Sequence, residues 1–323
     1  MDTKENKRDN KVVAVVVTYN RKQLLLECVQ AILKQSYPVH KLIIVDNAST
    51  DGTESYLNEN KIFENEIVDY QKMSTNTGGS GGFYVGLDLA RNYNADWVWI
   101  MDDDTIPYED SLQCLIEGTI QIPDASFFAS CVRGENGEPM NVPLINKNNA
   151  ENGYPYWYKN LKYGMVSIAT ATFVSILINA EAIKKCGLPC KDYFIWGDDT
   201  EYTRRLVKNY GLAYLVGKSW VCHKRKNAKN VHIKNETDKN RIRNYYYHYR
   251  NRLVNYYLYD GRLMYLLYIL RFECQAVASL FSKNHGFYKF YVIQKGVFGS
   301  FVHKSKFREY INNQLAASKR GIN

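Results

Sequence analysis

Two acidic clusters contain the side chains best suited to take part in a chemical reaction. The triplet Asp102, Asp103 and Asp104 follows the apolar run WVWIM. Such a run is typical of a buried strand, so the triplet is expected at a sheet edge, where a divalent cation could bridge carboxylates to a phosphate. The pair Asp198 and Asp199, in FIWGDDTEY, precedes a helical pattern. A carboxylate in a pocket there could take a proton from an incoming hydroxyl.

The triplet indicates a metal site, because three adjacent carboxylates repel one another unless a cation lies between them. Side chains alternate along a strand, so Asp102 and Asp104 are expected to face the site together, one near a ribose and the other on the metal. Hard oxygen ligands favour Mg²⁺ or Mn²⁺. Mn²⁺ also accepts nitrogen, which makes His223 in SWVCHK a candidate ligand, although a lone histidine is usually structural.

The second cluster favours acid–base chemistry. A desolvated carboxylate beside another carboxylate has a raised pKa, as a general base requires, and Asp199 is the preferred base with Asp198 as its partner. Trp196 offers a ring face on which a sugar could stack, so Trp196 and Glu201 are expected near an acceptor. The alternative is a plain helix start, where acidic side chains favour the helix dipole.

Two further segments are candidates for contact with a nucleotide. Asp46 ends the run KLIIVD and precedes turn-forming residues, so it either accepts from a base or ribose or caps the following turn. Asn76, Gly78 and Gly79 belong to the glycine-rich stretch NTGGSGG, whose backbone could approach a sugar or phosphate closely. The stretch matches no Walker or GxGxxG spacing, and a flexible loop is the other interpretation.

Alternating strand and helix patterns position these residues. The first half of the chain predicts strands at 12–17, 41–47, 66–73 and 97–101, with helices at 24–35 and 82–92. Units of this kind predict an α/β fold with a mostly parallel sheet flanked by helices, and ligands at the carboxyl ends of the strands.

The second half predicts a helix at 109–121, a strand at 126–133, a loop near the substrate at 135–158, a long β-type run at 165–178, a helix from 181, a helix at 201–210 and a strand at 212–216. From about residue 235 the pattern is helical to the end, with a break at Gly261. The predicted organisation is a polar tail at 1–10, a catalytic domain at 11–234 and a helical region at 235–323.

Charge is distributed unevenly along the 323 residues. The net charge is +9, but residues 217–323 carry +16 and residues 1–216 carry −7. A basic, tyrosine-rich helical region suits an anionic membrane surface or a lipid-linked acceptor, and the helices could also pair two copies of the chain. Nucleic acid would be attracted as well but is not the expected partner. The apolar stretch 263–281 is interrupted by Arg271 and Glu273, which disfavours a membrane span.

Cysteine usage and the polar start favour a reduced, cytoplasmic chain. The seven cysteines form no CxxC pair, and no secretory signal precedes the start MDTKENKRDNK. Zinc sites and disulfide frameworks are therefore disfavoured.

The ordered motifs VVVTYNR, IIVDNASTDGT, NTGGSGGF, WIMDDDT, FIWGDDTEY and SWVCHK resemble those of the family-2 glycosyltransferases over roughly residues 11–225. NTGGSGGF together with FIWGDDTEY is most similar to the bacterial galactofuranosyltransferases, with rhamnosyltransferases as near relatives. The resemblance implies a GT-A fold, a nucleotide-sugar donor, Mn²⁺ or Mg²⁺, and inversion at the anomeric carbon. It also implies a peripheral enzyme at the cytoplasmic face of the membrane that extends cell-surface polysaccharides, such as capsule or O-antigen, on lipid-linked carriers.

By motif, the resemblance assigns roles to individual residues. Asp46 would contact the uridine, and Thr18, Asn20, Asn76, Gly78, Gly79 and Asp103 would lie around the donor. Asp102 and Asp104 would serve the ribose and metal, His223 the metal, and Asp199 the acceptor hydroxyl.

The first expectation is transfer from UDP-galactofuranose. A dTDP-rhamnose-dependent enzyme is the alternative, and a non-catalytic protein that binds nucleotide sugars or polyanions is a distant one.

Overall fold

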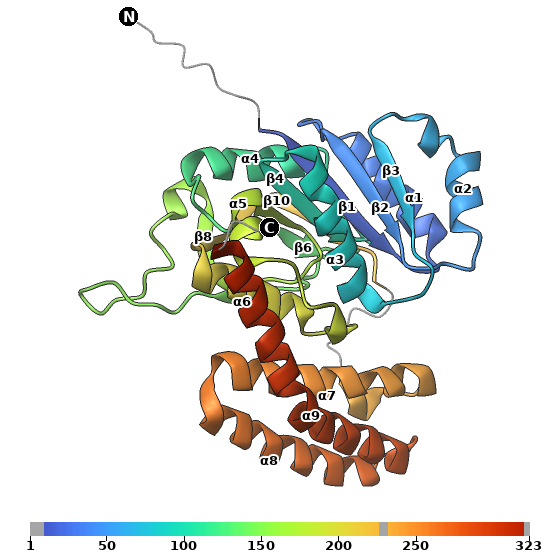
Figure 1. Cartoon of the computed structure of the whole chain (residues 1–323), viewed down its shortest axis with the longest axis vertical. Helices are drawn as coiled ribbons and strands as arrows, with labels where there is room; N and C mark the ends of the chain where they lie inside the picture. The colour runs from blue at the N-terminus through green and yellow to red at the C-terminus, as the bar shows by residue number, and fades with distance from the viewer. Residues whose placement is uncertain (1–9, 226–231, 320–323) are drawn as a thin grey trace, which may run out of the picture.

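The computed structural model describes residues 10–225 and 232–319. A central sheet is covered by helices on both faces, and a helical bundle lies at one end of the molecule (Figure 1). Most of the polar segment expected at 1–10, and the last four residues of the C-terminal region, lie outside the described residues.

One ten-stranded sheet runs through the described part of the chain, with the order β3-β2-β1-β4-β9-β6-β10-β8-β7 and β5 paired to β10. Neighbours within β3-β2-β1-β4 are parallel, as are β6 and β10, whereas β9, β8, β7 and β5 pair antiparallel. The strands are β1 (Val12–Thr18), β2 (Lys41–Asp46), β3 (Val68–Lys72), β4 (Trp97–Asp102), β5 (Thr105–Pro107), β6 (Phe127–Arg133), β7 (Leu144–Ile145), β8 (Met165–Thr170), β9 (Ile176–Asn179) and β10 (Ala213–His223).

Helices connect and cover these strands. They are α1 (Lys22–Leu33), α2 (Thr53–Glu59), α3 (Gly78–Ala90), α4 (Ser111–Gln121), α5 (Ala180–Cys186), α6 (Asp198–Asn209), α7 (Lys239–Tyr259), α8 (Gly261–Leu280) and α9 (Gly286–Lys319). The predicted α/β class with a C-terminal helical extension is confirmed, in the form of a mixed sheet.

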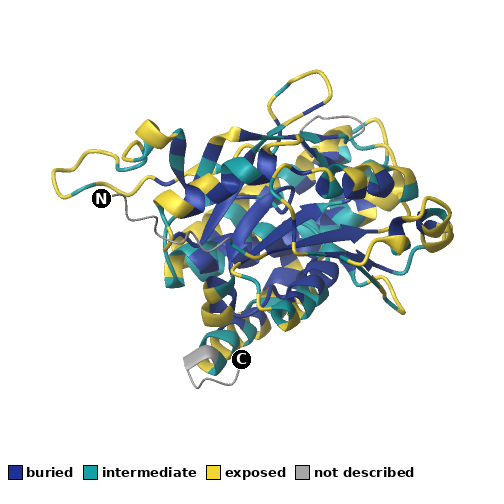
Figure 2. Ribbon diagram, turned by 90° about the horizontal axis from the view of Figure 1, so that it is seen from above, coloured by how far each residue is buried: buried dark blue, intermediate teal, exposed yellow. Residues whose placement is uncertain are grey.

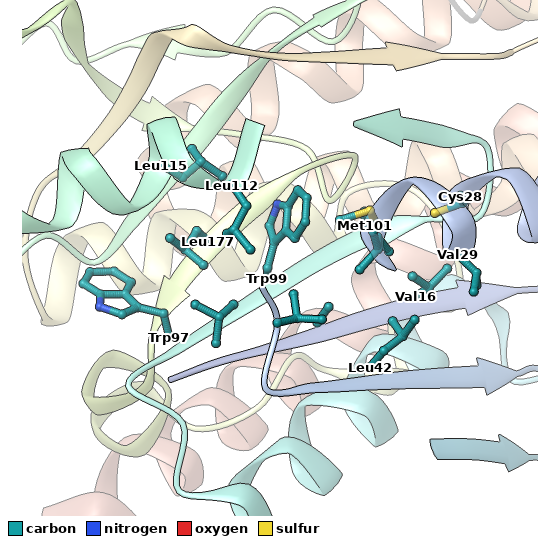
Figure 3. Packing of buried hydrophobic residues seen from close by; sticks show 14 of the residues in the cluster. Val16, Cys28, Val29, Leu42, Trp97, Trp99, Met101, Leu112, Leu115 and Leu177 are labelled. Carbon is teal, nitrogen blue, oxygen red and sulfur yellow. The ribbon is translucent and has the colours of Figure 1, made fainter. Parts of the chain in front are cut away.

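The buried strand β1 shows how the core is divided into two layers. Its even-numbered residues, such as Val16, pack with α1 and α4, and its odd-numbered residues, such as Val15, pack with α3 and α6. Figure 3 shows the first layer, with Trp99 and Met101 of β4 beside Val16. This alternation follows from the period of two along a strand. Buried strands therefore lie inside a shell of exposed helix faces and loops (Figure 2).

Three details differ from the sequence-based expectations. Helix α3 begins at Gly78, four residues earlier than expected, so the glycine-rich stretch forms its first turn. The β-type run at 165–178 is divided between β8 and β9, with a buried turn between them. The C-terminal region has a second break at 281–285 in addition to that at Gly261, so α8 and α9 are separate helices.

The helices α7, α8 and α9 enclose a hydrophobic cluster of their own, which contains Tyr245, Leu253, Phe272 and Ile293. Helix α9 is long enough to return to the catalytic domain, where Gln314 Oε1 accepts a hydrogen bond from the Leu188 amide at 2.9 Å. In the described part of the chain, α8 is the one helix with the length and composition of a membrane span, with a mean hydropathy of 1.3.

Candidate active site

The acidic triplet lies where β4 ends, next to the last residue of β10. Ligand atoms of Asp102, Asp104 and His223 all fall within 4.8 Å of one another. Burial and the neighbouring Asp104 carboxylate raise the pKa of Asp102 to about 8. A divalent cation at this spacing would stabilise the two carboxylates in their ionised form and the imidazole in its neutral form.

The orientation of His223 fits such a cation. Its Nδ1 lies 3.0 Å from Asn141 Oδ1, to which it donates in the tautomer that leaves Nε2 free to bind a cation. In the neutral ring, Nε2 then directs its lone pair at Asp104 Oδ1, 3.1 Å away. That carboxylate oxygen is buried and receives no hydrogen bond within the described structure. A cation shared by Asp104 and His223 would satisfy both atoms, and Asn141 would fix the ring as a neighbour of a metal ligand usually does.

Asp103 lies in the turn after β4 and is not part of this group of ligand atoms. Its Oδ2 accepts from the Thr18 hydroxyl at 2.7 Å, and its Oδ1 lies 3.1 Å from the Arg21 guanidinium. Burial raises the pKa of Asp103 to about 6 although Arg21 opposes the shift. Asp103 and Thr18 are both buried and bonded to each other, which corrects the expectation that they face the donor.

Asp46 is also engaged by the protein. Its Oδ1 accepts from the Ser49 amide at 2.7 Å, and its Oδ2 accepts from the Tyr70 hydroxyl at 2.5 Å. The turn-capping interpretation therefore describes this arrangement, and contact with a uridine stays a prediction. Asn20 lies nearby, accepts from the Thr50 amide at 2.7 Å, and remains exposed.

The glycine-rich stretch serves mainly to pack two loops together. Gly78 has a φ of +75°, and a Cβ there would lie 2.0 Å from the carbonyl oxygen of Phe194, so only glycine fits. Asn76 accepts from the Gly78 amide at 2.8 Å. The Gly78 amide is therefore engaged within the protein, whereas Asn76 is exposed and its contact with a donor stays a prediction. At Gly79, no described atom lies within 4 Å of the place that a Cβ would take, so an approach of the donor at that residue stays a prediction.

Asn47 joins the same two segments and was not predicted as a functional residue. Its Nδ2 donates to the Gly78 carbonyl at 2.8 Å, and its Oδ1 accepts from the Thr77 amide at 2.9 Å. The turn after β2 is thereby fixed to the start of α3. The sequence did contain a signal for this role, because Asn47 directly follows Asp46, the carboxylate that ends a predicted strand.

Asp198 and Asp199 form the first turn of α6, after a loop with an unusual backbone. Phe194, Trp196 and Gly197 have φ values of 66°, 61° and 92°. Left-handed backbone is uncommon for bulky residues and is typical of functional sites. Burial and the adjacent Asp199 raise the pKa of Asp198 to about 8, and burial also raises the pKa of Asp199.

Glu201 is not available to an acceptor. Its side chain is fully buried, its carboxylate pairs with Arg205 four residues later, and its Oε1 accepts from the Tyr259 hydroxyl at 2.8 Å. The expectation of an acceptor contact is therefore wrong for Glu201. Instead, its buried ion pair with Arg205 lies within α6, and the hydrogen bond from Tyr259 ties α6 to α7.

A cleft of about 560 Å³ joins the metal-ligand group to the Trp196 loop. Asp104 lies on one side and Ile195 and Trp196 on the other, but Asp198 and Asp199 are not among the lining residues. The cleft is rich in cationic and amide side chains, and its other lining residues are Asn20, Arg21, Gln23, Leu24, Lys224, Arg225, Arg241 and Asn244. This composition suits a phosphate-bearing ligand.

Helix α7 holds the left-handed loop in place. Asn251 Nδ2 lies within 3.0 Å of the carbonyl oxygens of Tyr193, Ile195 and Trp196. Asn255 Nδ2 donates to the Gly197 carbonyl at 2.8 Å. Asn251 supplies a side-chain donor to the carbonyls of Ile195 and Trp196, whereas those of Tyr193 and Gly197 also accept from Arg250 and from the Glu201 amide. Asn251 is thus a positioning residue for the acidic pair, although nothing in the local sequence marks it.

We expect Asn251→Leu to lower kcat about 100-fold while the affinity for UDP changes less than about threefold, because the loop shifts but the metal ligands do not. Stability should also fall by about 2 kcal/mol, since buried carbonyls lose their donor. Steady-state kinetics and calorimetry with UDP, at a temperature where circular dichroism shows a folded chain, measure both. Asn240→Leu, an exposed change on α7, is the matched control. An unaltered kcat in Asn251→Leu would contradict the positioning role.

The raised pKa of Asp198 gives a prediction about stability. The folded state holds its proton up to about pH 8, whereas the unfolded state releases it near pH 4, so this group makes stability fall as pH rises between these values. Asp198→Asn removes the effect. The unfolding free energy of Asp198→Asn should equal that of the parent chain at pH 4 and exceed it by more than about 1 kcal/mol at pH 8. Urea unfolding across this range tests the slope; a gain that is constant with pH would argue against it.

Comparison with known proteins agrees with this geometry. The protein family described as Glycosyl transferase family 2 matches residues 13–187. The galactofuranosyltransferases GlfT1 of Mycolicibacterium smegmatis and Mycobacterium tuberculosis are 27% identical over 217 and 209 residues, 63% of this chain in each case. These alignments span 67% and 66% of the relatives, about two thirds of their length. The abequosyltransferase RfbV of Salmonella typhimurium is 35% identical over 31% of this chain and 30% of its own.

Solved structures share the fold. A crystal structure of GalNAc-T7 with UDP, GalNAc and Mn²⁺ has a TM-score of 0.56 at 15% identity, and covers 74% of this chain and 50% of its own. The crystal structure of Staphylococcus aureus TarS 1-349 has a TM-score of 0.54 at 14% identity, and covers 90% and 72%. The predicted GT-A architecture is confirmed.

Proposed function

Because the chain belongs to glycosyl transferase family 2, and is therefore a glycosyltransferase as predicted, we propose that it transfers galactofuranose from UDP-galactofuranose to a hydroxyl of a lipid-linked glycan, with inversion at the anomeric carbon. The observation that carries the proposal is the group Asp102, Asp104 and His223, of which Asp104 lines the cleft that Trp196 also lines. The GlfT1 relatives support galactofuranose as the sugar.

The residues divide the chemistry between the two sides of the cleft. A divalent cation on Asp102, Asp104 and His223 would neutralise charge on the leaving diphosphate. Arg225 adds a positive side chain at the same cleft. Asp199, three residues after Trp196, would take the proton of the acceptor hydroxyl, and burial raises its pKa above that of an ordinary carboxyl group, which makes it a stronger base. One in-line displacement then inverts the anomeric carbon.

Asp198 and Asp199 do not line the cleft in this conformation. They follow Trp196 and Gly197 directly, so a small movement of the loop after acceptor binding would expose them. Loops that close on substrate commonly complete a catalytic site.

A panel of donors tests the proposal. Purified protein with Mn²⁺ or Mg²⁺ is incubated with UDP-galactofuranose, other UDP-sugars or dTDP-rhamnose and a synthetic lipid-linked acceptor, and products are identified by mass spectrometry. Transfer from UDP-galactofuranose is the expected result. Turnover of dTDP-rhamnose alone would reject this donor in favour of the rhamnosyltransferase alternative. Binding of a UDP-sugar without turnover across a broad acceptor set would argue against the proposed reaction.

A further inference from the structure

Helix α8 exposes apolar side chains on the side turned away from the protein. Its inward face contains Tyr265, Phe272 and Ala276, as in an ordinary packed helix. The opposite face is also apolar, with spacings of three, four and seven residues. Its exposed members are Leu263, Leu266, Leu267, Leu270, Val277 and Phe281. A helix of a soluble protein normally carries polar residues on this side.

Helix α9 extends the same surface. It runs antiparallel beside α8, since Tyr265 lies 3.0 Å from the Ser300 hydroxyl and Glu273 is bonded to Gln294. The exposed apolar side chains of the part of α9 that lies beside α8 are Phe287, Tyr291, Phe298, Phe301 and Val302. We call the exposed residues of both helices the α8–α9 apolar face. Phe287 and Phe281 are 83% and 86% exposed, which is costly for large apolar side chains in water.

The α8–α9 segment as a whole is basic, although Lys289 is buried and Lys306 is paired with Asp192. Residues 261–319 contain nine Lys and Arg against two Asp and Glu. Arg262 and Arg271 are exposed on α8, where long side chains can reach from an apolar layer to a charged one. A second copy of the chain would bring the same positive charge against itself. Anionic lipid headgroups would instead complement it.

We propose that the α8–α9 apolar face lies in the headgroup region of an anionic lipid bilayer, with α8 parallel to the membrane surface. A helix that is long and apolar enough to cross a membrane can also lie on one. Here the inward face of α8 remains packed against α7 and α9, so spanning would require this packing to be broken.

Helix α7 connects this face to the active site. Tyr249 and Tyr257 of α7 pack against Phe272 and Tyr265 of α8, with ring centroids 4.8 and 5.6 Å apart. The opposite side of the bundle faces the catalytic domain (Figure 1), and Arg241 of α7 lines the cleft. The cleft would therefore lie about one helix layer, roughly 10 Å, above the lipid headgroups. Membrane binding does not depend on the proposed donor, but it would bring a lipid-linked acceptor within reach.

Vesicle flotation with the full chain, without donor or acceptor, tests this surface independently of catalysis. Vesicles of phosphatidylcholine alone are compared with vesicles that also contain phosphatidylglycerol. We expect binding to the anionic vesicles, weakened by added salt. The double substitution Leu266→Asp with Leu270→Asp should lower the vesicle partition coefficient at least about tenfold. Both positions are exposed, so circular dichroism should be unchanged.

Ile120→Asp is the matched control, since Ile120 is an exposed apolar residue on α4 of the catalytic domain. It should bind vesicles as the parent chain does. Undiminished binding of the double variant would overturn the proposal. So would a dimer in analytical ultracentrifugation that the double variant dissociates, because the face would then pair two copies. Resistance to alkaline carbonate extraction would overturn the parallel orientation in favour of a span.

Discussion

Asp199→Asn is expected to lower kcat by about 10³-fold while the dissociation constant for UDP changes less than about twofold. The substitution keeps the size of the side chain and its acceptor oxygen for the Thr200 amide, which lies 2.6 Å from Asp199 Oδ1. It removes the ability to take a proton. General-base catalysis contributes about 10²- to 10⁴-fold, and the full amount should be lost if the acceptor hydroxyl has no other base.

Single-turnover transfer and calorimetric titration with UDP and Mn²⁺ separate the two quantities. Asp192→Asn is the matched control, because it removes one negative charge from the same loop region at a partly exposed side chain paired with Lys306. That variant should transfer sugar at the parent rate. A parallel loss of UDP affinity in Asp199→Asn would place the residue at the donor, and an undiminished kcat would remove it from the mechanism.

The sequence predicted the strand ends well because the physical rule behind them is simple. Carboxyl ends of parallel strands meet at one edge, and alternate side chains share a face. Asp102 and Asp104 meet His223, as expected. Asp103 and Asp104 lie in the turn after β4, beyond the reach of this rule, and both carboxylates contact Arg21 while Asp103 also accepts from Thr18.

Glu201 shows how a local signal can be outweighed. Its place in WGDDTEY favoured a role at the acceptor, but Arg205 stands four residues later, at the spacing of a helical ion pair. The two side chains are fully buried together. The i,i+4 spacing was visible in the sequence, whereas the burial that makes the pair structural depends on the packing of α6 against Tyr259 of α7.

The residue that holds the loop before Asp198 and Asp199 could not be predicted from the local sequence. Asn251 donates to carbonyls that precede it by 55 to 58 residues. A helix that carries Asn, Arg and Tyr at many positions gives no sign of which amide will be buried. The C-terminal region was predicted from its helical pattern, its charge and its tyrosines, none of which shows that α7 also supports the loop before α6.

Asp104→Ala is expected to abolish binding of Mn²⁺ in the presence of UDP and to lower kcat/KM by about 10³-fold or more. Asp104 contacts both His223 and Arg21: its Oδ1 lies 3.1 Å from His223 Nε2, and its Oδ2 lies 2.6 Å from Arg21 Nη1. Without it, Asp102 and His223 alone supply two ligand atoms, too few for tight binding of a divalent cation. The loss should persist at saturating Mn²⁺, because an anionic side chain that would hold the cation is gone.

Electron paramagnetic resonance of free Mn²⁺ measures this binding directly, and activity with and without EDTA measures the dependence. Asp110→Ala is the matched control, since this nearby carboxylate is exposed and makes no capping hydrogen bond at the start of α4. It should bind Mn²⁺ and respond to EDTA as the parent chain does. If Asp104→Ala retains both Mn²⁺ binding and EDTA sensitivity, the cation is held elsewhere, and the buried oxygen facing His223 needs another partner.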